Sequence, residues 1–126
     1  MTKYLTIEEI LVIHDFVIKE FGGSRGIRDR SALESAAHRP QAGYYSDIAE
    51  QATALMESLA NNHPFIDGNK RVAFFATDIF LRLNQHYIEC DSEFAYQFLN
   101  GLFETNKFKF ANLLPWLRQH IKAMQR

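Results

Sequence analysis

The sequence contains a single cysteine, Cys90, so it cannot form an internal disulfide. Small secreted domains commonly depend on disulfides, and their absence favours a reducing compartment. No apolar run approaches the roughly 20 residues that a membrane-spanning helix needs. The short apolar stretch Ile10–Ile13 is flanked by Glu8, Glu9 and Asp15, which argues against a signal peptide. We therefore expect a soluble, cytoplasmic protein with no membrane partner.

The chain also lacks an excess of positive charge. Its 14 Lys and Arg residues are balanced by 15 Asp and Glu residues, which leaves a formal net charge of -1. Proteins that bind nucleic acid usually carry a strongly basic face, and this balance disfavours a helical DNA-binding domain. No direct nucleic-acid binding is expected. Local phosphate binding stays open, because it needs only a few well-placed groups.

Apolar and aromatic side chains are abundant. Hydrophobic residues make up 47% of the chain and charged residues 23%, and 11 of the 126 residues are Phe. This composition is typical of an ordered globular protein rather than a disordered one. The length fits one compact domain over residues 1–126, with a core built largely on aromatic rings.

Helical periodicity runs along the chain and predicts an all-α bundle of about six helices. The first two helices begin at capping boxes, in which a Ser or Thr and a Glu three residues later satisfy each other's backbone N–H groups. These pairs are Thr6 with Glu9 and Ser31 with Glu34. Gly22-Gly23 ends the first helix, and Pro40 ends the second. Gln41 to Tyr45 is the only plausible place for a small hairpin.

Four further helices follow. The side chains expected to cap the third and fifth helices are Ser46 or Asp47 and Asp91 or Ser92. Pro64 stops the third helix. The fourth, from about Asn69 to Asn84, is apolar on nearly every side and should lie at the centre of the bundle. The last helix carries apolar residues from Leu113 to Met124, and Pro115 is tolerable there only in the first turn.

The most informative segment is the stretch from His63 to Arg71, which joins the third predicted helix to the fourth. A helix N-terminus presents unpaired N–H groups and a partial positive charge, which favours phosphate binding. Gly68 lets the backbone turn sharply or approach a ligand closely. Asn69 can cap the helix or donate to a phosphate oxygen. Lys70 and Arg71 oppose the helix dipole, so two cations here suggest a bound anion.

Asp67 and His63 supply the remaining groups that phosphoryl or nucleotidyl transfer needs. A lone carboxylate beside a phosphate site suits Mg²⁺, and His63 can accept a proton from an attacking hydroxyl. Structural interpretations compete: a His before Pro is most often a helix C-cap or a surface residue, and Asp-Gly is usually a turn. Zinc is not expected, because His63 lacks a second His or Cys at ligand spacing.

The evidence for a functional role is weaker for residues outside this segment. His14, on the apolar side of the first helix, either lines a groove or is an ordinary boundary histidine. Cys90 has no cation near it in sequence and reads as inert. Trp116 is expected to pack the last helix against the bundle. The loop arginines that can reach a phosphate, but are solvated by default, are Arg25, Arg28 and Arg30.

The segment His63–Arg71 resembles the active-site motif of the Fic/Doc (Fido) family, His-Pro-Phe-x-Asp/Glu-Gly-Asn-Gly/Lys-Arg, with every specified position filled. Other segments resemble the N-terminal half of the death-on-curing (Doc) toxin branch: Phe21–Gly23, Gly26–Asp29, Leu33–Ala36, Arg39–Gln41 and Tyr45. The resemblance runs from about Leu5 to Asn84 and implies a Fido-type helical bundle.

The resemblance also implies residue roles. His63 would deprotonate the target hydroxyl, Phe65 would be buried as the loop anchor, and Asp67 would hold Mg²⁺ on ATP or another nucleoside triphosphate. The residues implied to bind the nucleotide phosphates are Gly68, Asn69, Lys70 and Arg71. A small flap near residues 39–45 would align the target peptide through Arg39, Pro40, Gln41, Tyr44 and Tyr45. The two tyrosines are equally compatible with ordinary packing.

Lys70 separates two chemistries within the resemblance. The AMP-transferring branch has glycine there, whereas the Doc branch has lysine, binds the nucleotide reversed and transfers the γ-phosphate. Pro64 and Gly68 resemble the AMP-transferring branch, so AMP transfer to a protein hydroxyl stays an alternative. A lysine side chain competes for space with the α-phosphate, and we therefore predict a kinase-like phosphotransferase acting on a Ser/Thr hydroxyl.

The implied biology is that of a toxin–antitoxin system. A self-inhibiting Ser/Thr-x-x-x-Glu-Gly/Asn helix is missing, because the pairs Ser46/Glu50 and Thr53/Glu57 are followed by Gln51 and Ser58. The resemblance implies a cognate antitoxin whose C-terminal helix docks on the toxin, and translation elongation factor Tu as the target, with translation inhibited. A non-catalytic Fido module acting with an antitoxin is a further alternative, disfavoured by the complete set of motif side chains.

Overall fold

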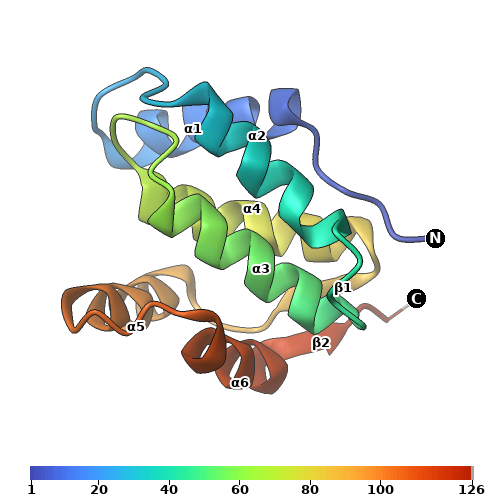
Figure 1. The fold of residues 1–126 in the computed structure, drawn as a ribbon. Coiled ribbons are helices and arrows are strands. Elements are labelled where there is room, and N and C mark those ends of the chain that lie inside the picture. The colour runs from blue at the N-terminus through green and yellow to red at the C-terminus, as the bar shows by residue number, and fades with distance from the viewer. Residues whose placement is uncertain (126) are drawn as a thin grey trace.

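The computed structural model describes residues 1–125 and confirms an all-α domain with a minor sheet. Its elements are α1 (Ile7–Phe21), α2 (Arg30–His38), the 3-10 helix η1 (Arg39–Gln41), α3 (Ile48–Asn61), α4 (Asn69–Leu83), β1 (His86–Ile88), α5 (Ser92–Glu104), α6 (Phe110–His120) and β2 (Ile121–Ala123). Figure 1 shows α1 and α2 above α3 and α4, and α5 and α6 below them. Among the described helices, none has the length and apolar character needed to cross a bilayer.

Most helix starts follow the predicted caps. Thr6 and Glu9 form both hydrogen bonds of a capping box at α1, and Asp47 and Asp91 cap α3 and α5. The predicted capping box at Ser31 is wrong. Asp29 caps α2 instead, with its carboxylate accepting from the backbone N–H of Ala32 at 3.1 Å. Ser31 therefore lies one residue inside the helix.

Helix α4 forms the centre of the core, as its apolar sequence predicts. Its buried side chains include Val72, Phe74, Phe80 and Leu81, and it packs against α1, α3, α5 and β1. Helix α3 meets it with small and medium residues that are almost fully buried, including Ala52, Leu55, Met56 and Leu59. The loop between these two helices is thereby held at one end of a rigid pair.

The predicted hairpin at Gln41 to Tyr45 is wrong. Pro40 is buried and lies in η1, so the chain tightens into a 3-10 turn there rather than extending. Gly43 then turns the backbone with a φ of +90°, and the next residues, 44–46, pair with no strand of the described chain. The sheet instead joins β1 to β2 antiparallel, with Ile88 opposite Ile121.

The last helix also differs from the sequence prediction. Pro115 lies inside α6 rather than in its first turn. The bond it removes would have ended on the carbonyl of Ala111, which is an exposed residue, so water can satisfy that carbonyl. The helix ends at His120, and Ile121 to Ala123 form β2, so the expected continuation to Met124 is wrong. Trp116 is buried and stacks on Phe98, as predicted.

Candidate active site

The loop of residues 63–68 is fastened by the side chain of Asn69 at the start of α4. Asn69 is buried; its Oδ1 accepts from the N–H of Phe65 at 3.0 Å, and its Nδ2 donates to the carbonyl of Phe65 at 2.9 Å. The ring of Phe65 is itself 1% exposed. Asn69 is therefore a brace for the loop, and what it offers a ligand is its backbone N–H in the first turn of α4.

His63 begins this loop in a left-handed conformation, with a φ of +49°. Non-glycine residues seldom adopt positive φ, and such residues cluster at functional sites. Arg28 holds the strained turn, because its guanidinium donates to the carbonyls of both Asn62 and His63. The His63 side chain stays exposed, with its ring edge-on to Phe103 at 6.1 Å between centroids.

Residues 24–29, between α1 and α2, lie alongside the active-site loop. Ile27 forms an isolated antiparallel bridge with Phe65, and the N–H of Ile66 donates to the carbonyl of Gly26 at 3.1 Å. The N–H groups of Arg28 and Asp29 both donate to the carbonyl of Pro64. Figure 1 shows the two loops together at one end of the bundle.

The Asp67 carboxylate is oriented by backbone N–H groups from both loops. Its Oδ1 accepts from Gly68 at 2.9 Å, and its Oδ2 accepts from Ser24 at 3.1 Å. On the other side, the Nε2 of His14 donates to the main-chain carbonyl of Asp67 at 2.9 Å, and the His14 ring stacks on Phe65 at 3.9 Å. Two charge-assisted bonds leave each oxygen with a further lone pair for a cation.

A pocket of about 260 Å³ opens beside this carboxylate. It is lined by Val17, Phe21, Gly22, Asp67, Gly68, Asn69, Lys70, Arg71 and Tyr96. Gly68 is the N-cap of α4, with a φ of +82°, and provides no side chain to pair the first N–H groups of the helix. Unpaired first-turn N–H groups, a helix dipole and two cations give this pocket the chemistry that suits an anion. His63 is not part of its lining and lies at the other end of the same loop.

The two predicted phosphate-binding cations are held by α5. The Arg71 guanidinium lies 4.0 Å from the ring centroids of both Phe21 and Tyr96 and pairs with Glu93 at 2.8 Å. The Lys70 ammonium donates to Oδ1 of Asn100 at 2.7 Å. Both cations are therefore fixed at the pocket wall rather than free in solvent.

The donor set fits a magnesium ion that arrives with its nucleotide. Among residues 1–125 no cluster of three or more His, Cys, Asp or Glu residues is placed to bind a metal by itself. Asp67 is the one carboxylate that lines the pocket. Mg²⁺ commonly binds through one or two carboxylates and completes its shell with phosphate oxygens and water. Asp67 beside an anion site matches that pattern.

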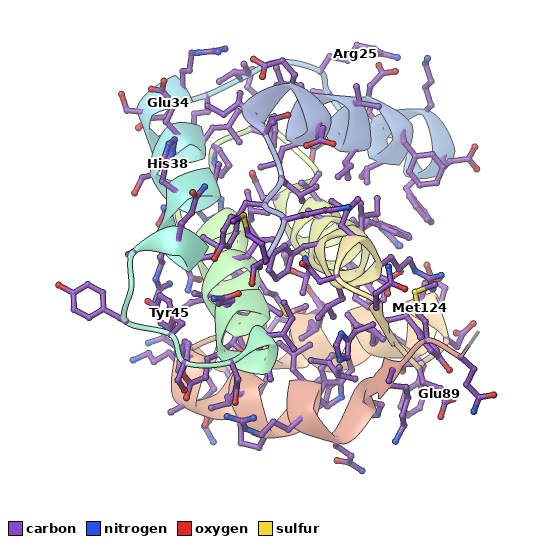
Figure 2. The ribbon with its side chains drawn as sticks, turned by 90° about the vertical axis from the view of Figure 1, so that its right-hand side faces the viewer. Arg25, Glu34, His38, Tyr45, Glu89 and Met124 are labelled. Carbon is purple, nitrogen blue, oxygen red and sulfur yellow. The ribbon has the colours of Figure 1, made fainter. Side chains whose placement is uncertain are left out.

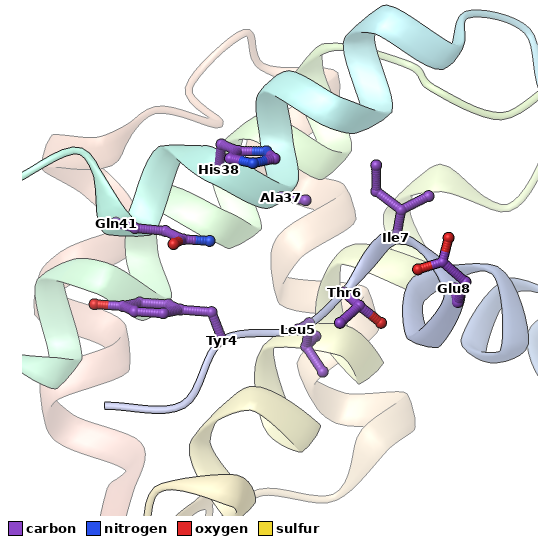
Figure 3. A pocket seen from close by; sticks show the side chains of 8 residues that line it. All are labelled: Tyr4, Leu5, Thr6, Ile7, Glu8, Ala37, His38 and Gln41. Carbon is purple, nitrogen blue, oxygen red and sulfur yellow. The ribbon is translucent and has the colours of Figure 1, made fainter. Parts of the chain in front are cut away.

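A second cavity, of about 300 Å³, lies between the N-terminal segment and the end of α2. Figure 3 shows Tyr4, Glu8, His38 and Gln41 among the side chains that line it. No Lys or Arg lines this cavity, and Gln41 is its only residue from the predicted site. The smaller pocket, unlike this cavity, is lined by Asp67 and by the predicted phosphate-binding residues.

Residues 39–45, the predicted flap, lie elsewhere in the structure. The Arg39 guanidinium donates to Tyr45, to Glu57 and to Ser58, and the Tyr45 ring stacks on Phe110. Tyr44 is 86% exposed. Within residues 1–125, no hydrogen bond, ion pair or ring contact joins this segment to residues 63–71. Figure 2 likewise separates Tyr45 from Arg25, which belongs to the loop beside the site.

Sequence reasoning missed several residues that position the site. Gly22-Gly23 ends α1 as predicted, but the sequence did not indicate that the next residue, Ser24, reaches the carboxylate of Asp67. Tyr96, Asn100 and Phe103 on α5 contact the motif residues, and no local signal marks them. Their spacing places them on one side of a helix, but it indicates contact with the motif only once α5 is known to face the motif.

Comparisons with known proteins identify relatives of this chain. The model of the Fic/DOC family matches residues 4–81. The chain is 40% identical over 96 residues to a protein named Toxin Doc from Mycolicibacterium smegmatis, covering 72% of each chain. It is 31% identical over 86 residues to the "Protein kinase doc" of Escherichia phage P1, covering 65% of this chain and 68% of the phage protein.

Proposed function

The chain belongs to the Fic/DOC family, and on this basis we propose that it is a Doc-like toxin that phosphorylates a protein. In this proposal the γ-phosphate of ATP or another nucleoside triphosphate is transferred to a Ser/Thr hydroxyl. The observation that carries the proposal is the pocket at the start of α4, where one carboxylate faces an anion site with two cations. The name of the phage relative, a protein kinase, supports the same reaction class.

His63 is the proposed general base. It is exposed at the start of the loop, so a hydroxyl on a large protein can approach it. The imidazole takes the proton as the hydroxyl oxygen attacks the γ-phosphorus, and the bond from that phosphorus to the β-phosphate oxygen breaks. A kinase of this kind relies mostly on positioning and charge stabilisation.

The pocket residues have distinct parts in the proposed reaction. The first-turn N–H groups of α4, with Lys70 and Arg71, bind the nucleotide phosphates. Asp67 would hold Mg²⁺, which when bound neutralises charge that develops between the β- and γ-phosphates. Asn69 and Phe65 keep the loop closed around this arrangement.

Lys70 is the residue that favours phosphate transfer over AMP transfer. Its ammonium lies over the ring of Phe103 at 5.0 Å from the centroid, on the side of the loop where His63 is found. Because Lys70 and His63 contact the same ring, a γ-phosphate bound by the ammonium would lie on the same side of the loop as the base. The α-phosphate would need the space that the glycine of the AMP-transferring branch leaves open. AMP transfer is therefore the second candidate, supported by Pro64 and Gly68.

The target segment is proposed to approach along residues 24–29. That loop already pairs with Phe65 through Ile27, and both Ile27 and Ile66 have exposed side chains on this pair of loops. The predicted flap at residues 39–45 stays a prediction with no contact to support it. The proposed target is translation elongation factor Tu, and the proposed regulator is a cognate antitoxin; both rest on the resemblance to Doc toxins.

The experiment uses ATP labelled on either the α- or the γ-phosphate, with the purified chain and elongation factor Tu. We expect label on the target only from the γ-position, and none with His63→Ala. Label from the α-position alone would establish AMP transfer instead. No label from either position, on purified factor or in a bacterial lysate, would favour the non-catalytic alternative. Circular dichroism of His63→Ala checks that the variant is folded.

A further inference from the structure

One side of α5 contacts the active-site segment along its whole length. The residues on this side are Glu93, Tyr96, Asn100 and Phe103, spaced three, four and three positions apart, which places them in one helical stripe. Glu93 and Tyr96 contact Arg71, and Asn100 and Phe103 contact Lys70. Phe103 also meets His63, so a single helix face touches the base and both cations.

This face of α5 gives Lys70 and Arg71 partners of different charge. Arg71 is paired with a carboxylate, Glu93, whereas Lys70 is paired with the neutral amide of Asn100. Within the described part of the chain no carboxylate forms an ion pair with Lys70. An amide oxygen orients an ammonium without cancelling its charge, so the full charge of Lys70 remains available to an anion.

The orientation of the Asn100 amide is itself fixed. Its Nδ2 donates to the carboxylate of Glu104 one turn later, at 3.1 Å, which directs Oδ1 toward Lys70. The ring of Phe103 lies under the same ammonium at 5.0 Å and limits where it can swing. The lysine, a flexible side chain in solution, is thus held by two neighbours on one helix.

We propose that Asn100 is a positioning residue for Lys70, which holds the ammonium ready for the nucleotide phosphates while leaving it charged. This inference rests on the proposed function, since it takes Lys70 to be a phosphate ligand. Asn100 acts through Lys70 and touches neither the nucleotide nor the target. Its loss would therefore weaken nucleotide binding only as far as Lys70 contributes to it.

The test is a double-mutant cycle on Asn100 and Lys70, read out as the Kd of Mg-ATP by calorimetry. Asn100→Leu keeps the size of the side chain and removes the acceptor, and we expect its Kd to rise about tenfold. Lys70→Ala should raise the Kd further, and adding Asn100→Leu to it should change nothing more. Gln97→Leu, an exposed amide on the same helix away from the motif, is the matched control and should bind as the wild type does.

Two further variants distinguish a loss of positioning from a folding defect. Glu104 is exposed, so Glu104→Leu leaves the core intact while it frees the Asn100 amide, and it should raise the Kd about threefold. Glu104→Gln keeps an acceptor and should restore wild-type binding. The inference is overturned if Asn100→Leu binds like Gln97→Leu, or if its effect adds in full to that of Lys70→Ala. Failure of the wild type to bind Mg-ATP would instead contradict the proposed function.

Discussion

At the scale of single residues, the position of the Asp67 carboxylate depends on Gly23, in the loop between α1 and α2. A Cβ built on Gly23 would lie 2.7 Å from Oδ2 of Asp67, well inside van der Waals contact. Gly23 also has a φ of +121°, which side-chain-bearing residues rarely adopt. The Ser24 N–H reaches the carboxylate only because the preceding residue has no side chain.

Gly23→Ala is therefore expected to impair the carboxylate as well as the fold. The backbone strain should lower the free energy of unfolding by about 1–2 kcal/mol, and displacement of Asp67 should weaken Mg²⁺-dependent nucleotide binding. Gly43→Ala is the matched control: its φ is +90°, an added Cβ meets no atom within 4 Å, and the residue does not line the pocket. It should lose stability alone. Equal Mg²⁺ dependence of binding in the two variants would contradict this role for Gly23.

At the scale of elements, Glu57 joins three helices through one side chain. Its Oε1 accepts from Arg39 in η1, and its Oε2 accepts from the N–H of Phe110 in the first turn of α6, each at 2.6 Å. Helix α6 has no side-chain cap of its own at Lys109, so Glu57 supplies a capping acceptor from α3. Burial lowers the pKa of Arg39, but its bonds to Glu57 and Tyr45 outweigh that effect and raise it.

Glu57→Ala should destabilise the protein by about 2 kcal/mol, because it removes the carboxylate that pairs with Arg39 and leaves the first turn of α6 uncapped. Urea denaturation followed by circular dichroism measures this loss. The control is Arg118→Ala, which removes an exposed pair with Asp47 at 3.0 Å and should cost about 0.5 kcal/mol. If the two variants lose equal stability, Glu57 does not cap α6.

The elements that could be predicted from the sequence are those set by local rules. Thr6 with Glu9, Asp47 and Asp91 act within a few residues, and their caps are confirmed. The predicted cap at Ser31 was wrong because Asp29, two residues earlier, caps a helix equally well. Local propensity does not decide between the two residues.

Long-range pairing explains what could not be predicted. Strand β2 exists only because it pairs with β1, which places Ile88 opposite Ile121. The two strands are separated in the sequence by α5 and α6. Pro115 is accepted within α6 because water reaches the carbonyl that it leaves unpaired, and that exposure depends on the finished fold. The same distinction applies to the candidate site. The motif His63–Arg71 is contiguous and can be recognised in the sequence, whereas the contact between Asn100 and Lys70 joins residues 30 positions apart.

At the scale of the whole molecule, the site depends on more than the segment that the family model matches. That match ends at residue 81, within α4. The partners of both cations lie beyond it on α5, and α6 packs on α3 next to the Glu57 carboxylate. The last third of the chain therefore sets how the motif residues are held.

Asp47 makes a similar long-range connection, and it predicts how stability changes in acid. Its carboxylate accepts from the N–H of Glu50 at the start of α3 and pairs with Arg118 of α6 at 3.0 Å. The bond from Glu50 and then the pair with Arg118 outweigh the opposing effect of burial, and the pKa of Asp47 lies below its ordinary value of 3.8. A lowered pKa stabilises the fold above 3.8, and this contribution disappears as the pH falls through the lowered value.

Asp47→Asn isolates that contribution, because Asn caps a helix about as well as Asp but carries no charge. At neutral pH the variant should be less stable than the wild type by about 0.5 kcal/mol, since the pair with Arg118 is largely exposed. The difference should shrink toward zero at a pH below that lowered pKa, where the wild-type carboxylate is protonated as well. Urea denaturation at both pH values measures it, with Glu20→Gln, an exposed carboxylate that forms no ion pair within residues 1–125, as the control. A difference that persists unchanged in acid would show that Asp47 stabilises the contact between α3 and α6 through its shape and not its charge.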